Sequence, residues 1–234
     1  MVVLCRVRAE PLARAFTLLL LVGLAAVGCG GGSRSGVTSS AVSVKARRVL
    51  AFGDSVTLGV TTSGEQTFIV SRPYPTTLGD LLRAMINKES STLNAGVGGE
   101  LTAAGASRFP GALAGSGADV VLILEGVNDA RQLEPVGAIV GNLQSMVRTA
   151  KASGITPLIG TLPPERLSAT NPVAPHLEAV NAAILAMAAQ EGIGVVDFFR
   201  GMTVEDLSDD GFHPSQNGYV VMANLAFQVI AGLP

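Results

Sequence analysis

The sequence predicts an α/β fold in which a five-stranded, mostly parallel sheet lies between two layers of helices, a three-layer α/β/α sandwich. From Arg48 onward, short apolar runs alternate with segments of helical periodicity. The run at 119–124 (DVVLIL) is almost continuously apolar, as expected of a strand covered on both faces. Ligands of such folds bind at the carboxyl ends of the strands, and the segments most suited to chemistry follow those ends here.

The first half of this domain contains two predicted strands and two predicted helices. The first strand covers residues 49–52 (VLAF), and a second is expected over 92–95. The first helix is expected over 76–87 and the second over 102–113. In the first helix the apolar side chains recur at helical spacing, namely Leu78, Leu81, Leu82, Met85 and Ile86.

The second half continues the alternation without an internal repeat. The strand at 119–124 is the clearest of the five. Helix, strand, helix, strand and helix then follow at 136–152, 156–160, 175–190, 194–198 and 215–231. The 234 residues allow one ordinary domain, predicted over 48–234, and 48% hydrophobic against 15% charged residues permit a large buried core.

The N-terminal residues have the layout of a secretory signal. Three arginines precede an apolar run at 15–27, which is short for a membrane-spanning helix. The run ends at Gly28-Cys29 and resembles a bacterial lipoprotein signal, although Ala26 stands where that pattern usually has leucine. We therefore predict a signal peptide over 1–28, lipidation of Cys29, and export to the outer side of the cytoplasmic membrane, the periplasm or the outer membrane. An ordinary signal peptide or an uncleaved anchor is the alternative.

Composition excludes several classes of function for the remainder. Residues 29–47 are rich in Gly, Ser and Thr, which predicts a flexible tether. After removal of 1–28, 13 basic and 17 acidic residues remain without a basic run, so a nucleic-acid partner is not expected. Both cysteines, Cys5 and Cys29, precede the domain, which therefore has no disulfide or thiolate cluster. With only two histidines as well, no metal or other cofactor is predicted.

A serine directly follows the first predicted strand, in the run Gly53-Asp54-Ser55-Val56. A serine at a strand-to-helix turn can expose its hydroxyl at the sheet edge, close to helix N-terminal amides that stabilise negative charge. Taken alone, Gly-Asp-Ser is also ordinary turn and N-cap chemistry, so both interpretations stay open.

Two further blocks follow the second and third strands. The run 94–100 (NAGVGGE) is glycine-rich, so its backbone can approach a ligand and donate an amide to an oxyanion. Leu101 stands where a dinucleotide-binding loop needs its third glycine, which leaves a ligand-free turn as the alternative. The run 125–129 (EGVND) contains Asn128, whose amide can donate to an oxyanion or cap a turn.

The C-terminal block 208–215 (SDDGFHPS) contains Asp210 and His213. An aspartate three residues before a histidine can fold back to bond the imidazole, which fixes its tautomer and stabilises the imidazolium. The other histidine, His176, follows Pro175 at a predicted helix start and is expected on the surface.

In order, these four blocks resemble those of the SGNH/GDSL hydrolase family, whose fold is a flavodoxin-like sandwich, and the resemblance covers residues 48–231. It implies that Ser55 is the nucleophile, His213 the base and Asp210 the triad acid. It also implies an oxyanion hole formed by the Ser55 amide, the Gly99 amide and the Asn128 side chain. The family gives two further aspartates of the blocks, Asp54 and Asp129, supporting structural roles.

The resemblance implies cleavage of carboxylic esters through an acyl-enzyme on Ser55, in an esterase, lipase, lysophospholipase or carbohydrate deacetylase. The expected partners are a small-molecule, lipid or glycan ester and the membrane, through Cys29. An O-acyltransferase with the same triad is the alternative, whereas an inactive surface lipoprotein would have lost a triad residue. Segments 61–73 and 162–174 either border the site or simply connect elements. The acyl group, its acceptor and the oligomeric state stay open.

Overall fold

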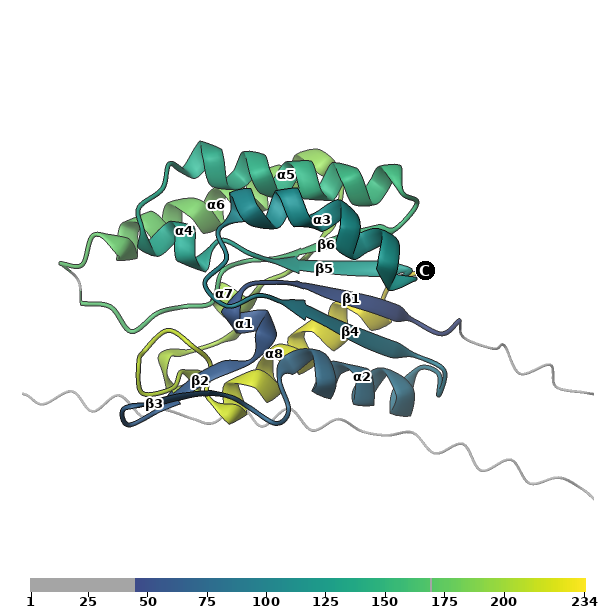
Figure 1. Ribbon diagram of the computed structural model, residues 1–234, viewed down its shortest axis with the longest axis horizontal. Coiled ribbons are helices and arrows are strands. Elements are labelled where there is room, and N and C mark those ends of the chain that lie inside the picture. The colour runs from purple at the N-terminus through teal and green to yellow at the C-terminus, as the bar shows by residue number, and fades with distance from the viewer. Residues whose placement is uncertain (1–44, 169) are drawn as a thin grey trace, which may run out of the picture. The chain divides into compact units, whose positions relative to one another are not determined.

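The computed structural model describes residues 45–168 and 170–234, which form a three-layer α/β/α sandwich (Figure 1). The predicted signal peptide, Cys29 and most of the predicted tether lie outside these residues. The central sheet is parallel throughout, in the order β4-β1-β5-β6-β7, which confirms the predicted fold class. Its strands are β1 (Arg48–Gly53), β4 (Ser91–Gly96), β5 (Val120–Leu124), β6 (Thr156–Gly160) and β7 (Gly194–Val196).

Burial along the strands follows their place in the sheet. All five residues of β5 are buried, as are five of the six in β1, because helices cover both faces of these central strands. The edge strand β4 is mostly part-exposed. Gly53 of β1 pairs with Gly96 of β4 and with Leu124 of β5, so the ends of these three strands are level. The residues that follow them therefore meet at one edge of the sheet.

Helices cover both faces of the sheet (Figure 1). On one face, α2 (Tyr74–Met85) packs against α8 (Gln216–Ala231). On the other, α5 (Val136–Ala152) lies between α3 (Thr102–Ser116) and α6 (Val173–Glu191). These are the five predicted helices, with ends shifted by at most three residues.

Several short elements were not predicted. The segment after β1 forms a one-turn helix, α1 (Ser55–Leu58), and an antiparallel hairpin of β2 (Val60–Ser63) and β3 (Gln66–Ile69). The strand predicted over 194–198 ends at Val196, because Phe198 already begins a helix. The remaining short elements are α4 (Val127–Arg131), α7 (Phe198–Gly201) and the 3-10 turn η1 (Val204–Asp206). Among the described residues, no helix has both the length and the apolar character that crossing a membrane requires.

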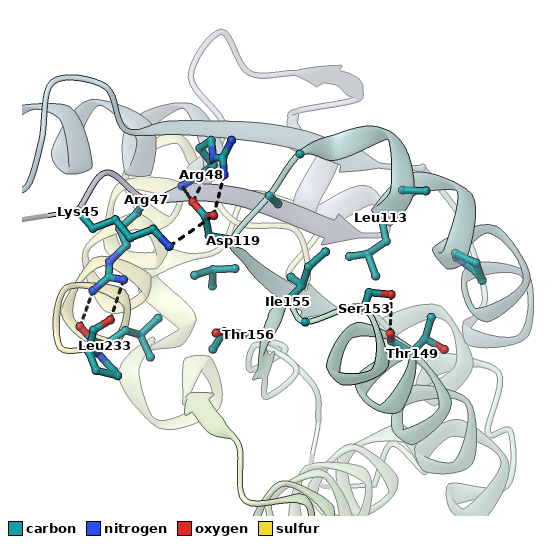
Figure 2. Close-up of a pocket in the computed structure, with 17 residues that line it drawn as sticks. Lys45, Arg47, Arg48, Leu113, Asp119, Thr149, Ser153, Ile155, Thr156 and Leu233 are labelled. Atoms are coloured by element: carbon teal, nitrogen blue, oxygen red, sulfur yellow. Dashed lines mark hydrogen bonds and ion pairs between the residues drawn. The ribbon is translucent and has the colours of Figure 1, made fainter.

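The amino-terminal edge of the sheet contains a cavity of about 670 Å³ (Figure 2). Arg47, the last residue of the predicted tether, is only 8% exposed and donates to the carbonyls of Leu233 and Pro234. The packed domain therefore begins before residue 48, where it was predicted to start. The other two cations on the cavity wall, Lys45 and Arg48, both pair with Asp119.

Candidate active site

Ser55 lies at a sharp turn between β1 and α1. A Cβ atom on Gly53 would lie 2.0 Å from the Leu124 carbonyl oxygen, so only glycine lets the chain turn this close to β5. The next residue, Asp54, caps α1, because its Oδ1 accepts a hydrogen bond from the Val56 N–H at 2.9 Å. Ser55 is the first residue of the helix and is 7% exposed. The turn thus fixes the backbone that carries the predicted nucleophile.

Residues of the second block, 94–100, connect α1 to β4. The Asn94 side chain donates to the Thr57 carbonyl and accepts from the Gly96 N–H, both at 2.9 Å. A Cβ on Gly96 would lie 2.1 Å from the Leu58 nitrogen, so this glycine is needed for close packing. Gly99 differs, because it is exposed, has a φ of 75° and faces open space. The block therefore combines a packing function with one open backbone amide.

The structure brings Ser55, His213 and Asp210 into one line of hydrogen bonds. The His213 Nε2 lies 2.9 Å from the Ser55 Oγ, and the His213 Nδ1 lies 2.7 Å from the Asp210 Oδ2. Because the carboxylate oxygen accepts from Nδ1–H, the Nε2 atom is free to accept the serine proton. This is the arrangement of a Ser-His-Asp triad.

Asp210 receives more hydrogen bonds than the one from the imidazole. Its Oδ1 accepts from the backbone N–H groups of Phe212 and His213, each at 3.0 Å, and from the Ser208 Oγ at 3.1 Å. Its Oδ2 also accepts from the Thr62 Oγ1 at 2.7 Å. Burial alone would raise the pKa of Asp210, but these hydrogen bonds hold that pKa well below its ordinary value. Asp210 is therefore a stable anion, and Thr62 of the hairpin is a contributor that the sequence did not predict.

Burial has the opposite effect on the imidazole. It disfavours the charged form and lowers the pKa of His213, while Asp210 raises it and Arg131 lowers it further. The pKa of His213 therefore lies below its ordinary value of 6.5. At neutral pH His213 is therefore uncharged and able to accept a proton.

The three predicted oxyanion donors lie at the same sheet edge. Gly99 and Asn128 follow β4 and β5, the two strands that flank β1. The Asn128 Nδ2 donates to the Glu100 carbonyl at 2.9 Å, which orients the amide and leaves its second hydrogen available. Within the described part of the chain, neither the Ser55 N–H nor the Gly99 N–H donates a hydrogen bond. Both amides are available to a developing oxyanion.

Three buried acidic side chains follow the ends of β1 and β5, namely Asp54, Glu125 and Asp129. Asp129 is satisfied by the Thr102 N–H at 2.9 Å and the Thr102 hydroxyl at 2.6 Å, and so anchors the start of α3. Glu125 is 1% exposed, and neither of its oxygens has a hydrogen-bond partner among the described residues. Burial, reinforced by the charge of Asp54, raises the pKa of Glu125 to about 10, and burial raises that of Asp54 to about 7. Both acids bind a proton more tightly than exposed carboxyls do.

Both segments predicted to border the site or merely connect elements contact the loop that carries Asp210. In the β2–β3 hairpin, the Gly64 N–H donates to Asp209 at 2.6 Å. In the β6–α6 loop, the Arg166 N–H donates to the Gly211 carbonyl at 2.7 Å.

His176, predicted on the surface, is part-exposed on α6, and its Nε2 lies 2.9 Å from the Glu134 carbonyl oxygen. Across residues 45–168 and 170–234, no group of three or more His, Cys, Asp or Glu side chains is arranged to hold a metal ion.

The fold and the triad together define a serine hydrolase. The model of the GDSL-like lipase/acylhydrolase family matches residues 51–221, and the chain belongs to this family and is a carboxylic ester hydrolase.

Solved structures agree with this family. A lipase/acylhydrolase from Enterococcus faecalis is 27% identical with a TM-score of 0.69, and the match covers 80% of this chain and 96% of that one. The M. smegmatis aryl esterase is 18% identical with a TM-score of 0.70, covering 81% and 100%. An acetylxylan esterase from Geobacillus stearothermophilus is 19% identical with a TM-score of 0.68, covering 82% and 97%. No curated protein matches the chain.

Proposed function

We propose that the protein hydrolyses esters through an acyl-enzyme on Ser55, with His213 as general base and Asp210 as the acid that orients it. The observation that carries this proposal is the line of hydrogen bonds from Asp210 through His213 to the Ser55 hydroxyl, at 2.7 and 2.9 Å. The lowered pKa of His213 supports it, because the imidazole is uncharged at neutral pH and can accept the serine proton.

In the first half-reaction, the Ser55 Oγ attacks the ester carbonyl while its proton passes to the His213 Nε2. The negative charge on the carbonyl oxygen is stabilised by the Ser55 N–H, the Gly99 N–H and the Asn128 side chain. The imidazolium then gives its proton to the departing alcohol. In the second half-reaction water attacks the acyl-enzyme, His213 takes the water proton, and the carboxylic acid leaves as Ser55 recovers its hydrogen.

The substrate we propose is an ester of a small molecule or of a glycan alcohol. Two structural neighbours are named as an acetylxylan esterase and an aryl esterase, which favours such alcohols. Rates on a series of p-nitrophenyl esters from acetyl to palmitoyl, together with acetylated xylan, would define the acyl group. A rate that rises steadily toward palmitoyl would contradict this choice and favour a lipase or lysophospholipase.

The decisive experiment compares Ser55→Ala with Ser153→Ala, a control at the opposite edge of the sheet. We expect Ser55→Ala to lose about 10⁴-fold or more in kcat on p-nitrophenyl acetate, since removal of a triad member leaves only binding and the oxyanion hole. Ser153→Ala should match the wild type. A fluorophosphonate probe should label a peptide containing Ser55. Near wild-type turnover by Ser55→Ala would exclude the mechanism.

Transfer to an alcohol is distinguished from hydrolysis by its products. The acyl-enzyme would be offered an excess of a sugar or glycerol hydroxyl, and the acid and the new ester would be quantified. The proposal expects the free acid as the main product. A new ester as the main product would make the protein an O-acyltransferase with the same triad.

We also propose that the protein is exported and anchored to a membrane through a lipidated Cys29, on the basis of the N-terminal sequence pattern. Metabolic labelling with a fatty acid, followed by detergent phase partition, tests this in the wild type and in Cys29→Ser. Label and detergent partition that persist in Cys29→Ser would overturn lipidation at this residue.

A further inference from the structure

Arg131 lies at the end of α4, three residues after Asn128, and contacts two other segments. Its guanidinium carbon lies 4.0 Å from the centre of the Phe212 ring, a cation–π distance. Its Nη1 lies 2.6 Å from the Glu165 Oε2 in the loop between β6 and α6. The side chain thus connects the helix that carries a predicted oxyanion donor to the loop that carries Asp210 and His213.

Phe212 also contacts the base, His213. The Phe212 ring lies 3.9 Å from the His213 ring, with 38° between the ring planes. Arg131, Phe212 and the imidazole are therefore linked by successive contacts, with the phenyl ring touching both the guanidinium and the imidazole.

Glu165 holds the guanidinium in place. Its side chain is 2% exposed, and burial raises its pKa while Arg131 opposes that shift. Arg131 itself remains 38% exposed. Solvent therefore already stabilises its charge, and burial of the cation does not explain its contacts. Because the Glu165 carboxyl is almost fully buried, it orients Arg131 more firmly than a carboxyl in an ion pair on the surface would.

We propose that Arg131 is a positioning residue for His213, holding the Phe212 ring against the imidazole so that the His213 Nε2 stays directed at Ser55. This inference rests on the proposed function, in which His213 is the base. The same guanidinium also disfavours a proton on the imidazole.

The charged groups around His213 fix the sign of that second effect. Asp210 on its own loop favours the imidazolium, and Arg131 from α4 opposes it. The β6–α6 loop adds Glu165, paired with Arg131, and Arg166, which donates to carbonyls of the 204–208 segment. Asp209 is bonded to Gly64 of the hairpin, while Ser55 of α1 and Thr62 of β2 contribute neutral hydroxyls. Without the Arg131 charge, the pKa of His213 should rise.

The experiment measures kcat and kcat/KM against pH for Arg131→Met, Arg131→Lys and a control. The control is Arg148→Met, which removes another exposed arginine paired with a glutamate, Glu191 on α6. Arg131→Met should lower kcat about tenfold with little change in KM, because the imidazole loses its support. The acid limb of kcat/KM should move up by about 0.5 pH unit, since loss of a nearby cation favours the imidazolium. Arg131→Lys should restore the limb, and Arg148→Met should match the wild type.

A second variant separates support from charge. Phe212→Leu keeps the arginine cation and removes the aromatic ring, so kcat should fall while the acid limb stays in place. If Arg131→Met fails to fold, Phe212→Leu still tests whether the Phe212 ring holds the imidazole in place. Unchanged kcat in Phe212→Leu, or an unmoved acid limb in a folded Arg131→Met, overturns the proposal. Failure of the proposed function is distinguishable, because Ser55→Ala would then retain its activity.

Discussion

The two edges of the central sheet carry charge in different ways. At the amino edge, beside a cavity of about 670 Å³, the cations Lys45 and Arg48 are 73% and 58% exposed and share Asp119 as their partner. At the carboxyl edge, Glu125 is 1% exposed with no partner among the described residues, and His213 is 7% exposed. Lys45 and Arg48 in this cavity are thus satisfied by solvent and Asp119, and Arg47 is hydrogen-bonded to carbonyls. Buried ionisable groups with shifted pKa values, and not the size of a cavity, mark the reactive edge.

The largest expected effect at the carboxyl edge comes from Asp210→Asn. An amide in this position can bind the wrong imidazole tautomer, so kcat should fall by about 10⁴-fold. Asp119→Asn, the equivalent change at the amino edge, should leave kcat unchanged. Steady-state kinetics on p-nitrophenyl acetate at pH 7.5 measures both. A loss of less than tenfold in Asp210→Asn would mean that this carboxylate does not orient the base.

Asn128→Ala should have the next largest effect. Removal of one oxyanion donor costs about 10²–10³ in kcat, with little change in KM, because the lost interaction forms only as charge develops. Asn224→Ala, an exposed amide on α8, is the matched control. An effect of Asn128→Ala confined to KM would argue for a role in ground-state binding instead.

Glu125→Gln should change stability and its dependence on pH. The pKa of Glu125 is raised to about 10 in the folded protein, so the folded state holds a proton that the unfolded chain has released at pH 7–9. The free energy of unfolding should therefore fall with rising pH, by about 1.4 kcal/mol per pH unit from this group. Urea unfolding at pH 7 and 9 should show that slope reduced in Glu125→Gln. Identical slopes in the two proteins would show that Glu125 is not a protonated buried acid.

The smallest effect is expected from the ion pairs of the amino edge. Arg48 holds the pKa of Asp119 below its ordinary value, yet Arg48 is largely exposed and the pair is screened by salt. Asp119→Asn should lower Tm by no more than about 4 °C, and the difference should shrink in 0.5 M salt. A larger, salt-independent loss in thermal unfolding would show that this edge contributes to stability as a buried network does.

The fold was predictable because its central strands are short apolar runs buried on both faces. The continuous apolar run of β5 is typical of a central strand, and the helices repeat apolar residues at regular spacing. The β2–β3 hairpin escaped prediction because its strands have four residues each, and every residue of β3 is exposed. Without a buried face there is no alternation of apolar and polar residues to read.

Contacts in the site were predictable from the residues alone only where they are close in sequence, whereas the pairing of Ser55 with His213 came from the family resemblance. Asp210 and His213 are three residues apart, so their contact follows from local geometry. Thr62 reaches Asp210 across 148 residues, which no local pattern indicates. The burial of Glu125 was equally hidden, because an ionisable residue at a strand end is ordinarily solvated and only the packing around α3 excludes water here.

The bonds from Arg47 to the carbonyls of Leu233 and Pro234 tie the first and last described segments of the domain together. They lie at the edge where β1 begins, whereas Ser55 follows the end of that strand (Figure 1). A support joined at Lys45 or at Pro234 would therefore be attached at the sheet edge opposite Ser55. An enzyme attached to a bead at either of these positions would have the edge that carries Ser55 facing the solution.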